Sequence, residues 1–173
     1  CMHREFIVQE SAEDEVPDLN KLDSNLTSEL SISHVLMVHC EKTSGILNPL
    51  EEFAEIVSRH IRSLIIDAMS TFGAIPLDAH KILFDAVIAS SNKCLESVPG
   101  IGFAIIRKEL LAKCHGNAHS LSLDLYDQWQ AMEVSGQWRF TPPTHVIAAF
   151  DRALEQFENE GGVTGRFARY SEN

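Results

Sequence analysis

Short runs of apolar residues alternate with segments in which apolar residues recur at helical spacing. The apolar runs predict buried strands over residues 34–40, 63–68, 84–91 and 102–107. The helical spacing predicts a surface helix that carries Leu19, Leu22, Leu26 and Leu30, an amphipathic helix over 49–60, and a helical or turn segment near 78–82. Apolar strands separated by helices indicate an α/β fold whose largely parallel sheet is covered on both faces.

The last third of the chain has longer helical patterns in place of this alternation. Helices are predicted over 121–134 and 144–160, on either side of the loop SGQWRFTPPT. Gly161 and Gly162 are typical of a helix C-terminus. Four residues near the first of these helices are typical of a helix start with a Ser or Asp cap: Ser122, Asp124, Tyr126 and Asp127.

The composition is that of one ordinary globular domain. The 173 residues are 45% hydrophobic and 23% charged, which excludes a disordered or fibrous chain. Lys and Arg total 14 against 25 Asp and Glu, a formal net charge of -11. Neither nucleic acid nor an anionic membrane surface is therefore an expected partner. No run reaches the roughly 18 apolar residues that a membrane span needs.

The ends of the chain and its cysteines bear on its context. The chain opens on Cys1 rather than Met and ends without a terminal signal, so we expect one partial domain, 1–173, of a longer protein. No signal peptide is visible, and the expected location is cytoplasmic. The four cysteines form no CxxC pair and are predicted to be reduced thiols: Cys1, Cys40, Cys94 and Cys114.

Polar residues collect directly after the first three predicted strands. His39 to Ser44 follow the first strand, Asp67 closes the second, and Ser90 to Lys93 follow the third. In an open α/β sheet, ligands bind beyond the carboxyl ends of the strands. An acid, a lysine and a hydroxyl-rich turn are thus expected at one edge of the sheet.

Asp67 and Lys93 each have an ordinary interpretation, as a turn or cap aspartate and as a solvated surface lysine. Together they match the two groups that pyridoxal chemistry requires. One is an amine that binds the aldehyde covalently, and the other is a carboxylate that faces the pyridinium nitrogen. The segment between them has about the length of one strand-to-strand crossover, which places them on strands that can be neighbours.

Five motifs, in order along the chain, carry a family resemblance. They are HCEKTSGILNPL (39–50), IIDAMSTFGA (65–74), SSNKCLESVPGIGF (90–103), SLSLDLYDQW (120–129) and WRFTPPTHV (138–146). Together they resemble the 2-aminoethylphosphonate:pyruvate aminotransferases, a family in the class V branch of the fold-type I pyridoxal-phosphate enzymes. The resemblance runs from Ile32 to Asn173. It implies that this chain is part of the large, cofactor-binding domain of such a transferase.

The resemblance also implies roles for particular residues. Lys93 corresponds to the lysine that binds pyridoxal phosphate, and Asp67 to the aspartate that keeps the pyridine nitrogen protonated. Thr141 is similar to the threonine that reaches the cofactor phosphate of the partner subunit in a homodimer. Asn92 would lie near the cofactor, and His39 would begin the turn beneath its ring. The implied reaction passes the amino group of 2-aminoethylphosphonate to pyruvate, giving phosphonoacetaldehyde and L-alanine.

The sequence departs from the family pattern at one position of the first turn and in its extent. Lys42 stands where the family has a hydroxyl residue, and the alternative is that Thr43 supplies that hydroxyl while Lys42 turns to solvent. Lys42 and Arg139 are the candidates for the phosphonate dianion. The family's phosphate-binding turn and its small C-terminal domain lie outside 1–173.

Four other interpretations bear on this sequence. A serine–pyruvate or alanine–glyoxylate aminotransferase, and a non-catalytic relative that serves as a binding or dimerisation module, stay open as alternatives. VPGIGF precedes a strand rather than a helix, which argues against a dinucleotide loop. Cys114, His115 and His119 lack a second ligand pair, which argues against zinc. Trp129 and Trp138 are expected in a core or an interface.

Overall fold

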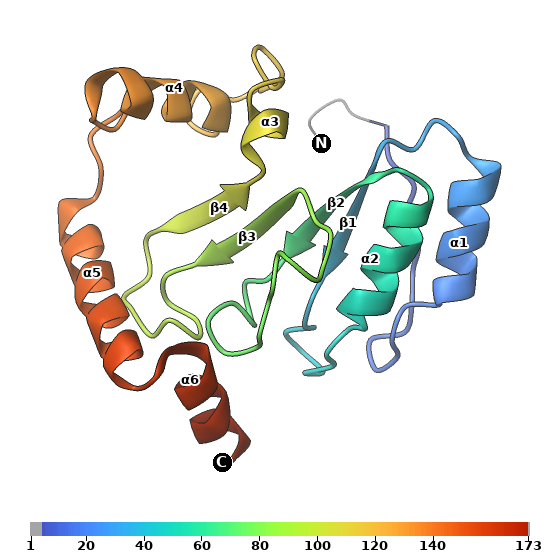
Figure 1. The fold of residues 1–173 in the computed structure, drawn as a ribbon, viewed down its shortest axis with the longest axis horizontal. Helices are drawn as coiled ribbons and strands as arrows, with labels where there is room; N and C mark the ends of the chain where they lie inside the picture. The colour runs from blue at the N-terminus through green and yellow to red at the C-terminus, as the bar shows by residue number, and fades with distance from the viewer. Residues whose placement is uncertain (1–4, 173) are drawn as a thin grey trace.

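The computed structural model describes residues 5–172, so Cys1 lies outside the described part of the chain. Figure 1 shows helices grouped around one sheet. The elements follow the order α1 (Leu19–Ser28), β1 (His34–Val38), α2 (Leu50–Arg59), β2 (Ser63–Asp67), β3 (Ala86–Ser90), β4 (Gly102–Ile106), α3 (Lys108–Leu111), α4 (Leu125–Ser135), α5 (Thr144–Asn159) and α6 (Gly162–Ser171). All four predicted strands are present, each one to three residues shorter than its apolar run.

The four strands form one sheet in the order β1-β2-β3-β4. β1, β2 and β3 are parallel, whereas β4 is antiparallel to β3, with Ser90 opposite Gly102. The orientation of β4 follows from its connection, because residues 91–101 form a turn without the helix that a parallel crossover needs. The predicted α/β fold with a largely parallel sheet is confirmed, with one antiparallel strand at its edge.

One face of the sheet packs against α1 and α2 and forms the core. Strand side chains such as Leu64, Ile66 and Val87 meet Phe53 and Val57 of α2 there. In α1 the predicted leucine spacing places Leu22 and Leu26 inside. The N-cap of α1 is Asp18, whose Oδ1 accepts hydrogen bonds from the backbone N–H groups of Asn20 and Lys21.

The opposite face of the sheet is open, which corrects the expectation of helices on both faces. Leu36 of β1 points to this face and is 64% exposed, and its neighbours in register on β2 and β3, Ile65 and Ala86, are only half-buried. An apolar strand predicts burial of both faces but does not identify what covers each one. Within residues 5–172, no helix is long and apolar enough to cross a membrane.

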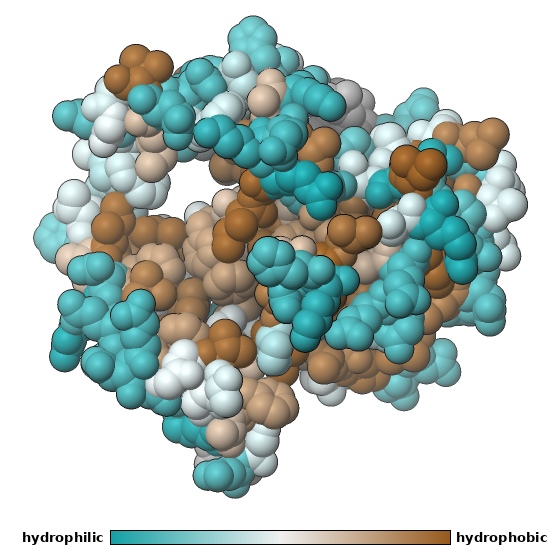
Figure 2. Space-filling view, viewed as in Figure 1, coloured by the Kyte–Doolittle hydropathy of each residue, from teal (hydrophilic) through white to brown (hydrophobic). Residues whose placement is uncertain are grey.

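The helices after β4, α3 to α6, extend along the β4 side of the sheet and are called the arm (Figure 1). Figure 2 shows an opening between the α4 part of this arm and the sheet, and apolar surface over the middle of the molecule. α4 begins at Leu125, later than predicted, because Asp124 caps it by accepting the N–H of Asp127 at 3.0 Å. Gly161 does end α5, but a further helix, α6, starts at Gly162. No periodicity noted in the sequence predicted α6.

Candidate active site

The parallel strands bring the predicted polar residues to one edge of the sheet. His39 follows β1, Asp67 ends β2, and Lys93 lies three residues after β3. The N–H of His39 donates to the carbonyl of Asp67 at 2.8 Å, and the N–H of Ala68 donates to the carbonyl of Ile88 at 2.9 Å. These backbone bonds hold the three strand ends level, so one small ligand at this edge can be approached from all three strands.

Asp67 is half-buried at the end of β2. Its Oδ1 accepts the backbone N–H of Met69 at 2.9 Å, a short-range bond that fixes the direction of the carboxylate. A carboxylate has about four acceptor positions, so it can accept a further N–H from a cationic ring while keeping the bond to Met69. The geometry therefore suits Asp67 to hold a protonated ring nitrogen.

Lys93 lies in a closed turn between β3 and β4. Ser91 is buried at the base of this turn, where its Oγ donates to the carbonyl of Val98 at 2.9 Å and its N–H donates to the carbonyl of Ile101. The N–H of Glu96 returns to the carbonyl of Lys93 at 2.8 Å. The side chains of Asn92 and Lys93 are exposed. The backbone is thus fixed while the amine of Lys93 is accessible.

The turn that carries Lys93, residues 91–101, is called the lysine turn, and it is joined to the segment that follows Asp67. The Sγ of Cys94 donates to the carbonyl of Ser70 at 3.2 Å, and burial raises the pKa of the Cys94 thiol, which keeps it neutral. The buried Leu95 packs against Gly73, where a Cβ would lie 2.7 Å from Leu95 Cδ2. The φ of Gly73 is 93°, a value that favours glycine. The two loops that carry Asp67 and Lys93 therefore pack as a unit.

His39 lies inside this edge rather than at its surface. The residue is 4% exposed, and its Nδ1 is 2.9 Å from the Oγ1 of the buried Thr71. Burial lowers the pKa of His39, so the ring is neutral near pH 7. Sequence reasoning missed Thr71, whose only signal was a hydroxyl residue beside Ser70 in a largely apolar turn. The contact between the buried side chains of His39 and Thr71 supports the loop after β2 from the interior of the protein.

The turn after β1 is closed at its base and exposed at its tip. Asn48 is buried there and donates through Nδ2 to the carbonyl of Val38 at 2.8 Å and to Glu41 Oε1 at 3.1 Å. Lys42 and Thr43 are both exposed at the tip. Both side chains are thus accessible to a ligand at the tip of this turn. Asn48 was also missed by sequence reasoning, although Asn before Pro at a helix start is a recognisable turn signal.

Thr141 and Arg139 lie outside this cluster, in the segment that leads into α5. Thr141 is exposed, and the first turn of α5 is placed by Val146, which packs so closely on Gly100 that a Cβ there would meet it at 3.0 Å. Arg139 is bound to the α4 side, with Nη2 2.8 Å from Asp127 Oδ2. Within this chain, therefore, the guanidinium of Arg139 is engaged by a carboxylate and is not brought together with Lys42.

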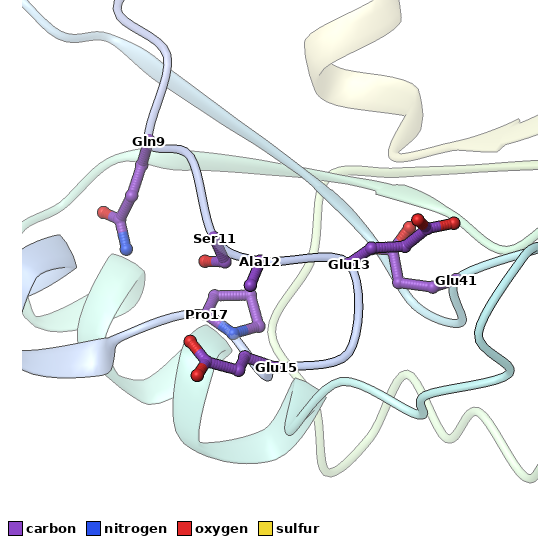
Figure 3. Close-up of a pocket in the computed structure, with 7 residues that line it drawn as sticks. All are labelled: Gln9, Ser11, Ala12, Glu13, Glu15, Pro17 and Glu41. Carbon is purple, nitrogen blue, oxygen red and sulfur yellow. The ribbon is translucent and has the colours of Figure 1, made fainter.

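A small cavity near the N-terminal segment has the wrong charge for an anionic cofactor. It has a volume of about 180 Å³ and is lined by Gln9, Ser11, Ala12, Glu13, Glu15, Pro17 and Glu41. Figure 3 shows the side chains of Glu13 and Glu41 converging on one side of it. None of the described residues that line it is basic, so a phosphate would find no cation there.

The family model for class V aminotransferases matches residues 6–168. The chain belongs to the class V aminotransferases. This family is pyridoxal-phosphate dependent and has the fold-type I architecture.

Relatives within the class V aminotransferases are similar over nearly the whole chain. The 2-aminoethylphosphonate–pyruvate transaminase of Pseudomonas fluorescens strain Pf0-1 is 55% identical over 98% of this chain and 46% of its own length. The chain therefore spans about half the length of the curated relatives it matches. The structure of pyridoxamine–pyruvate aminotransferase from Mesorhizobium loti superposes with a TM-score of 0.79 at 28% identity, covering 90% of this chain and 40% of that one.

A more distant structure supports the fold alone. Alanine–glyoxylate aminotransferase from Nostoc sp. matches with a TM-score of 0.77 at 21% identity, over 92% of this chain and 42% of that one.

The cofactor of this family fits the groups at the sheet edge. Asp67 supplies a carboxylate in a fixed direction, and Lys93 supplies an accessible amine, which are the two protein groups that pyridoxal chemistry requires.

Proposed function

We propose that the protein transfers the amino group of 2-aminoethylphosphonate to pyruvate with pyridoxal phosphate as cofactor, giving phosphonoacetaldehyde and L-alanine. The observation that carries this proposal is the placement of Asp67 and Lys93 at one edge of the parallel strands. The chain that holds them is 55% identical to a 2-aminoethylphosphonate–pyruvate transaminase. Asn92, next to the lysine, and the turn that begins at His39 would border the same cofactor.

Pyridoxal phosphate, when bound, supplies an electron sink for the carbon that carries the amino group. Lys93 Nζ would hold the cofactor through its aldehyde until a substrate amine displaces it. The freed Nζ would then act as a general base and take the proton from that substrate carbon. Asp67 would hold the proton on the ring nitrogen by presenting its negative charge to it.

The phosphonate group of the substrate needs local cations, because the chain as a whole carries a net charge of -11. Lys42 is exposed at the tip of the turn after β1 and is available for this role. Arg139 is a weaker candidate within this chain, because Asp127 already engages it at 2.8 Å. Thr43, beside Lys42, remains the candidate for a neutral hydroxyl contact to the cofactor ring.

The choice of amino donor tests the proposed function. Full-length protein supplied with pyridoxal phosphate and pyruvate should form alanine from 2-aminoethylphosphonate at least roughly 10²-fold faster than from serine, because a site built for a dianion leaves its cations unpaired with other donors. A coupled assay of alanine measures both rates, and an assay of phosphonoacetaldehyde identifies the product of the phosphonate donor. Turnover of serine, or of alanine with glyoxylate, in place of the phosphonate would contradict the substrate. No turnover of any donor would favour the non-catalytic module.

We also propose a homodimer in which Thr141 contacts the cofactor phosphate of the partner. Residues 121–140 support an interface because many large apolar side chains there are exposed: Leu121, Leu123, Leu125, Met132, Val134, Trp138 and Phe140. α4 itself has no buried residue. Because one protomer would complete the other's site, activity should depend on assembly.

Sedimentation of the full-length protein should therefore show a dimer. Thr141→Val should weaken pyridoxal phosphate binding by about tenfold while leaving the dimer intact, since one hydrogen bond to a charged group contributes about 1.5 kcal/mol or more. Thr144→Val, three residues later at the start of α5, is the matched control. A monomer at working concentrations, or equal effects of both variants, would remove Thr141 from the site.

A cytoplasmic location is part of the same proposal. The cysteines among residues 5–172, namely Cys40, Cys94 and Cys114, are free thiols. Free thiols are favoured in reducing compartments.

A further inference from the structure

Arg166 of α6 is a charged side chain in an interior position. It is 2% exposed and heads the largest fully buried side chains among the described residues. Its Nε and Nη2 bind Glu160 Oε2 at 2.8 and 2.7 Å, and its Nη1 lies 3.5 Å from Glu96 Oε2. The guanidinium also lies over the ring of Phe157, 5.3 Å from its centroid. Burial of an arginine is costly unless such partners surround it.

One further bond of Arg166 reaches the lysine turn. Its Nη1 donates to the backbone carbonyl of Cys94, 72 positions away in sequence. Cys94 directly follows Lys93, and its Sγ in turn donates to Ser70 beyond β2. Arg166 therefore holds the peptide next to Lys93 at the point where the lysine turn meets the loop after Asp67.

The local sequence brings Arg166 into this place. Gly161 has a φ of 100°, which turns the chain from α5 into α6. At Gly165 a Cβ would lie 1.9 Å from the carbonyl oxygen of Glu160, so only glycine permits α6 to pack this closely on the end of α5. This approach places the next residue, Arg166, against the Glu160 carboxylate.

The two carboxylates that surround Arg166 are ionised over the working pH range. Hydrogen bonds from Arg169 and Arg166 lower the pKa of Glu160 to about 2. The pKa of Glu96 is also lowered: partial desolvation opposes this shift, and hydrogen bonds from Tyr170 and Arg169 outweigh it. The buried guanidinium is thus matched by charge as well as by geometry.

Arg169 is an exposed counterpart of the buried Arg166. It binds the same two carboxylates, with Nε 2.6 Å from Glu160 Oε1 and Nη2 2.8 Å from Glu96 Oε1. Its side chain is exposed and binds the Glu96 side chain of the lysine turn, whereas Arg166 also binds the backbone carbonyl of Cys94. A comparison of the two arginines therefore separates the contacts with the two carboxylates from the bond to the turn's backbone at Cys94.

We propose that Arg166 is a positioning residue for Lys93: its bond to the Cys94 carbonyl, fixed by Glu160 and Glu96, sets the backbone of the lysine turn and through it the origin of the reactive amine. The proposal rests on the proposed function of Lys93. It does not require Arg166 to touch the cofactor or the substrate. A displacement of a reacting group by about 1 Å can cost roughly 10²-fold in rate.

Amide hydrogen exchange in the cofactor-free, full-length protein tests the structural half of this proposal. In Arg166→Met the amides of Glu96 and Ser97, which bond within the turn to the carbonyls of Lys93 and Ser91, should exchange at least roughly tenfold faster. Amides of β2 should keep their rates. Arg169→Gln should leave the turn amides within about twofold. Unchanged exchange at Glu96 and Ser97 in Arg166→Met would overturn the proposal.

Kinetics of the holoenzyme test the functional half. Arg166→Met should lower kcat roughly 10²-fold while KM for the amino donor changes little, because the amine is misplaced and the substrate site is not. Arg166→Lys, which keeps the charge and can reach the carbonyl, should recover part of kcat. A rise in KM with kcat unchanged, or an equal loss of kcat in Arg169→Gln, would overturn the positioning role.

Two further variants, Arg166→Lys and Lys93→Ala, cover the cases in which Arg166→Met does not fold or the proposed function is wrong. If Arg166→Met does not fold, Arg166→Lys serves in both measurements: faster exchange and a lower kcat than in the parent support the proposal, and parent-like exchange and kcat overturn it. If the proposed function itself is wrong, Lys93→Ala leaves cofactor binding unchanged. The exchange of Glu96 and Ser97 in Arg166→Met still reports on the turn in that case, so the two failures are distinguishable.

Discussion

Replacement of Lys93 by alanine is expected to abolish covalent retention of pyridoxal phosphate and to lower turnover by roughly 10²- to 10⁴-fold or more, since both the covalent attachment and the general base are lost. The turn should keep its shape, because its internal bonds involve the Lys93 carbonyl and Ser91 rather than the Lys93 amine. Borohydride treatment of the holoenzyme, followed by peptide mapping, should locate the cofactor on Lys93 in the parent protein.

Lys81→Ala is the matched control for this experiment. Its side chain is exposed, lies 3.8 Å from the carboxylate of Asp78 and is remote from the strand ends that carry Asp67 and Lys93. This variant should retain the cofactor and the parent rate. A borohydride-fixed cofactor that persists in Lys93→Ala, on whichever lysine it is found, would contradict the assignment of Lys93.

The second large effect is expected at Asp67. Asp67→Asn keeps an oxygen that can accept the Met69 N–H, a bond of 2.9 Å, so the loop after β2 should remain folded. The variant loses the negative charge that would keep the ring nitrogen protonated. Loss of such a preorganised charge should lower kcat by roughly 10²- to 10³-fold. Steady-state rates, together with the absorbance of the bound cofactor, measure this effect and show that the site is still loaded.

Asp78→Asn provides a control with the same local bonding. Asp78 Oδ1 accepts the backbone N–H of His80 at 2.9 Å, as Asp67 Oδ1 accepts that of Met69. Both variants thus alter an aspartate whose carboxylate accepts the backbone N–H of the residue two positions later, but only Asp67 lies at the sheet edge. Parent-like turnover in Asp67→Asn, or equal losses in the two variants, would show that Asp67 has the turn role alone.

The placement of Asp67 and Lys93 at one edge of the sheet could be predicted from the sequence because it depends on local patterns. An apolar run marks a strand, and parallel strands present their last residues at one edge. The cap at Asp124 was predictable for the same reason, since a cap bonds within three residues. These inferences needed no knowledge of which segments meet at long range.

Features that depend on contacts between residues far apart in the sequence could not be predicted from the sequence. The bond from Arg166 to Cys94 joins residues 72 apart, and nothing in the pattern of α6 distinguishes Arg166 from an exposed arginine. The burial of His39 depends on Thr71, 32 positions away. The open face beside Leu36 was missed because an apolar strand indicates a need for cover, and whether this chain meets that need is decided by tertiary packing.

The closed turn around Lys93 also has a kinetic consequence. Ser91 and Glu96 tie its backbone at both ends, so an amine that leaves and returns to a cofactor does so by rotation about side-chain bonds alone. Such rotations in exposed residues take picoseconds to nanoseconds, whereas loop rearrangements take nanoseconds to microseconds. Movement of the Lys93 amine should therefore not limit the proposed catalytic cycle, which leaves a bond-making or bond-breaking step or the departure of the product as the slow event.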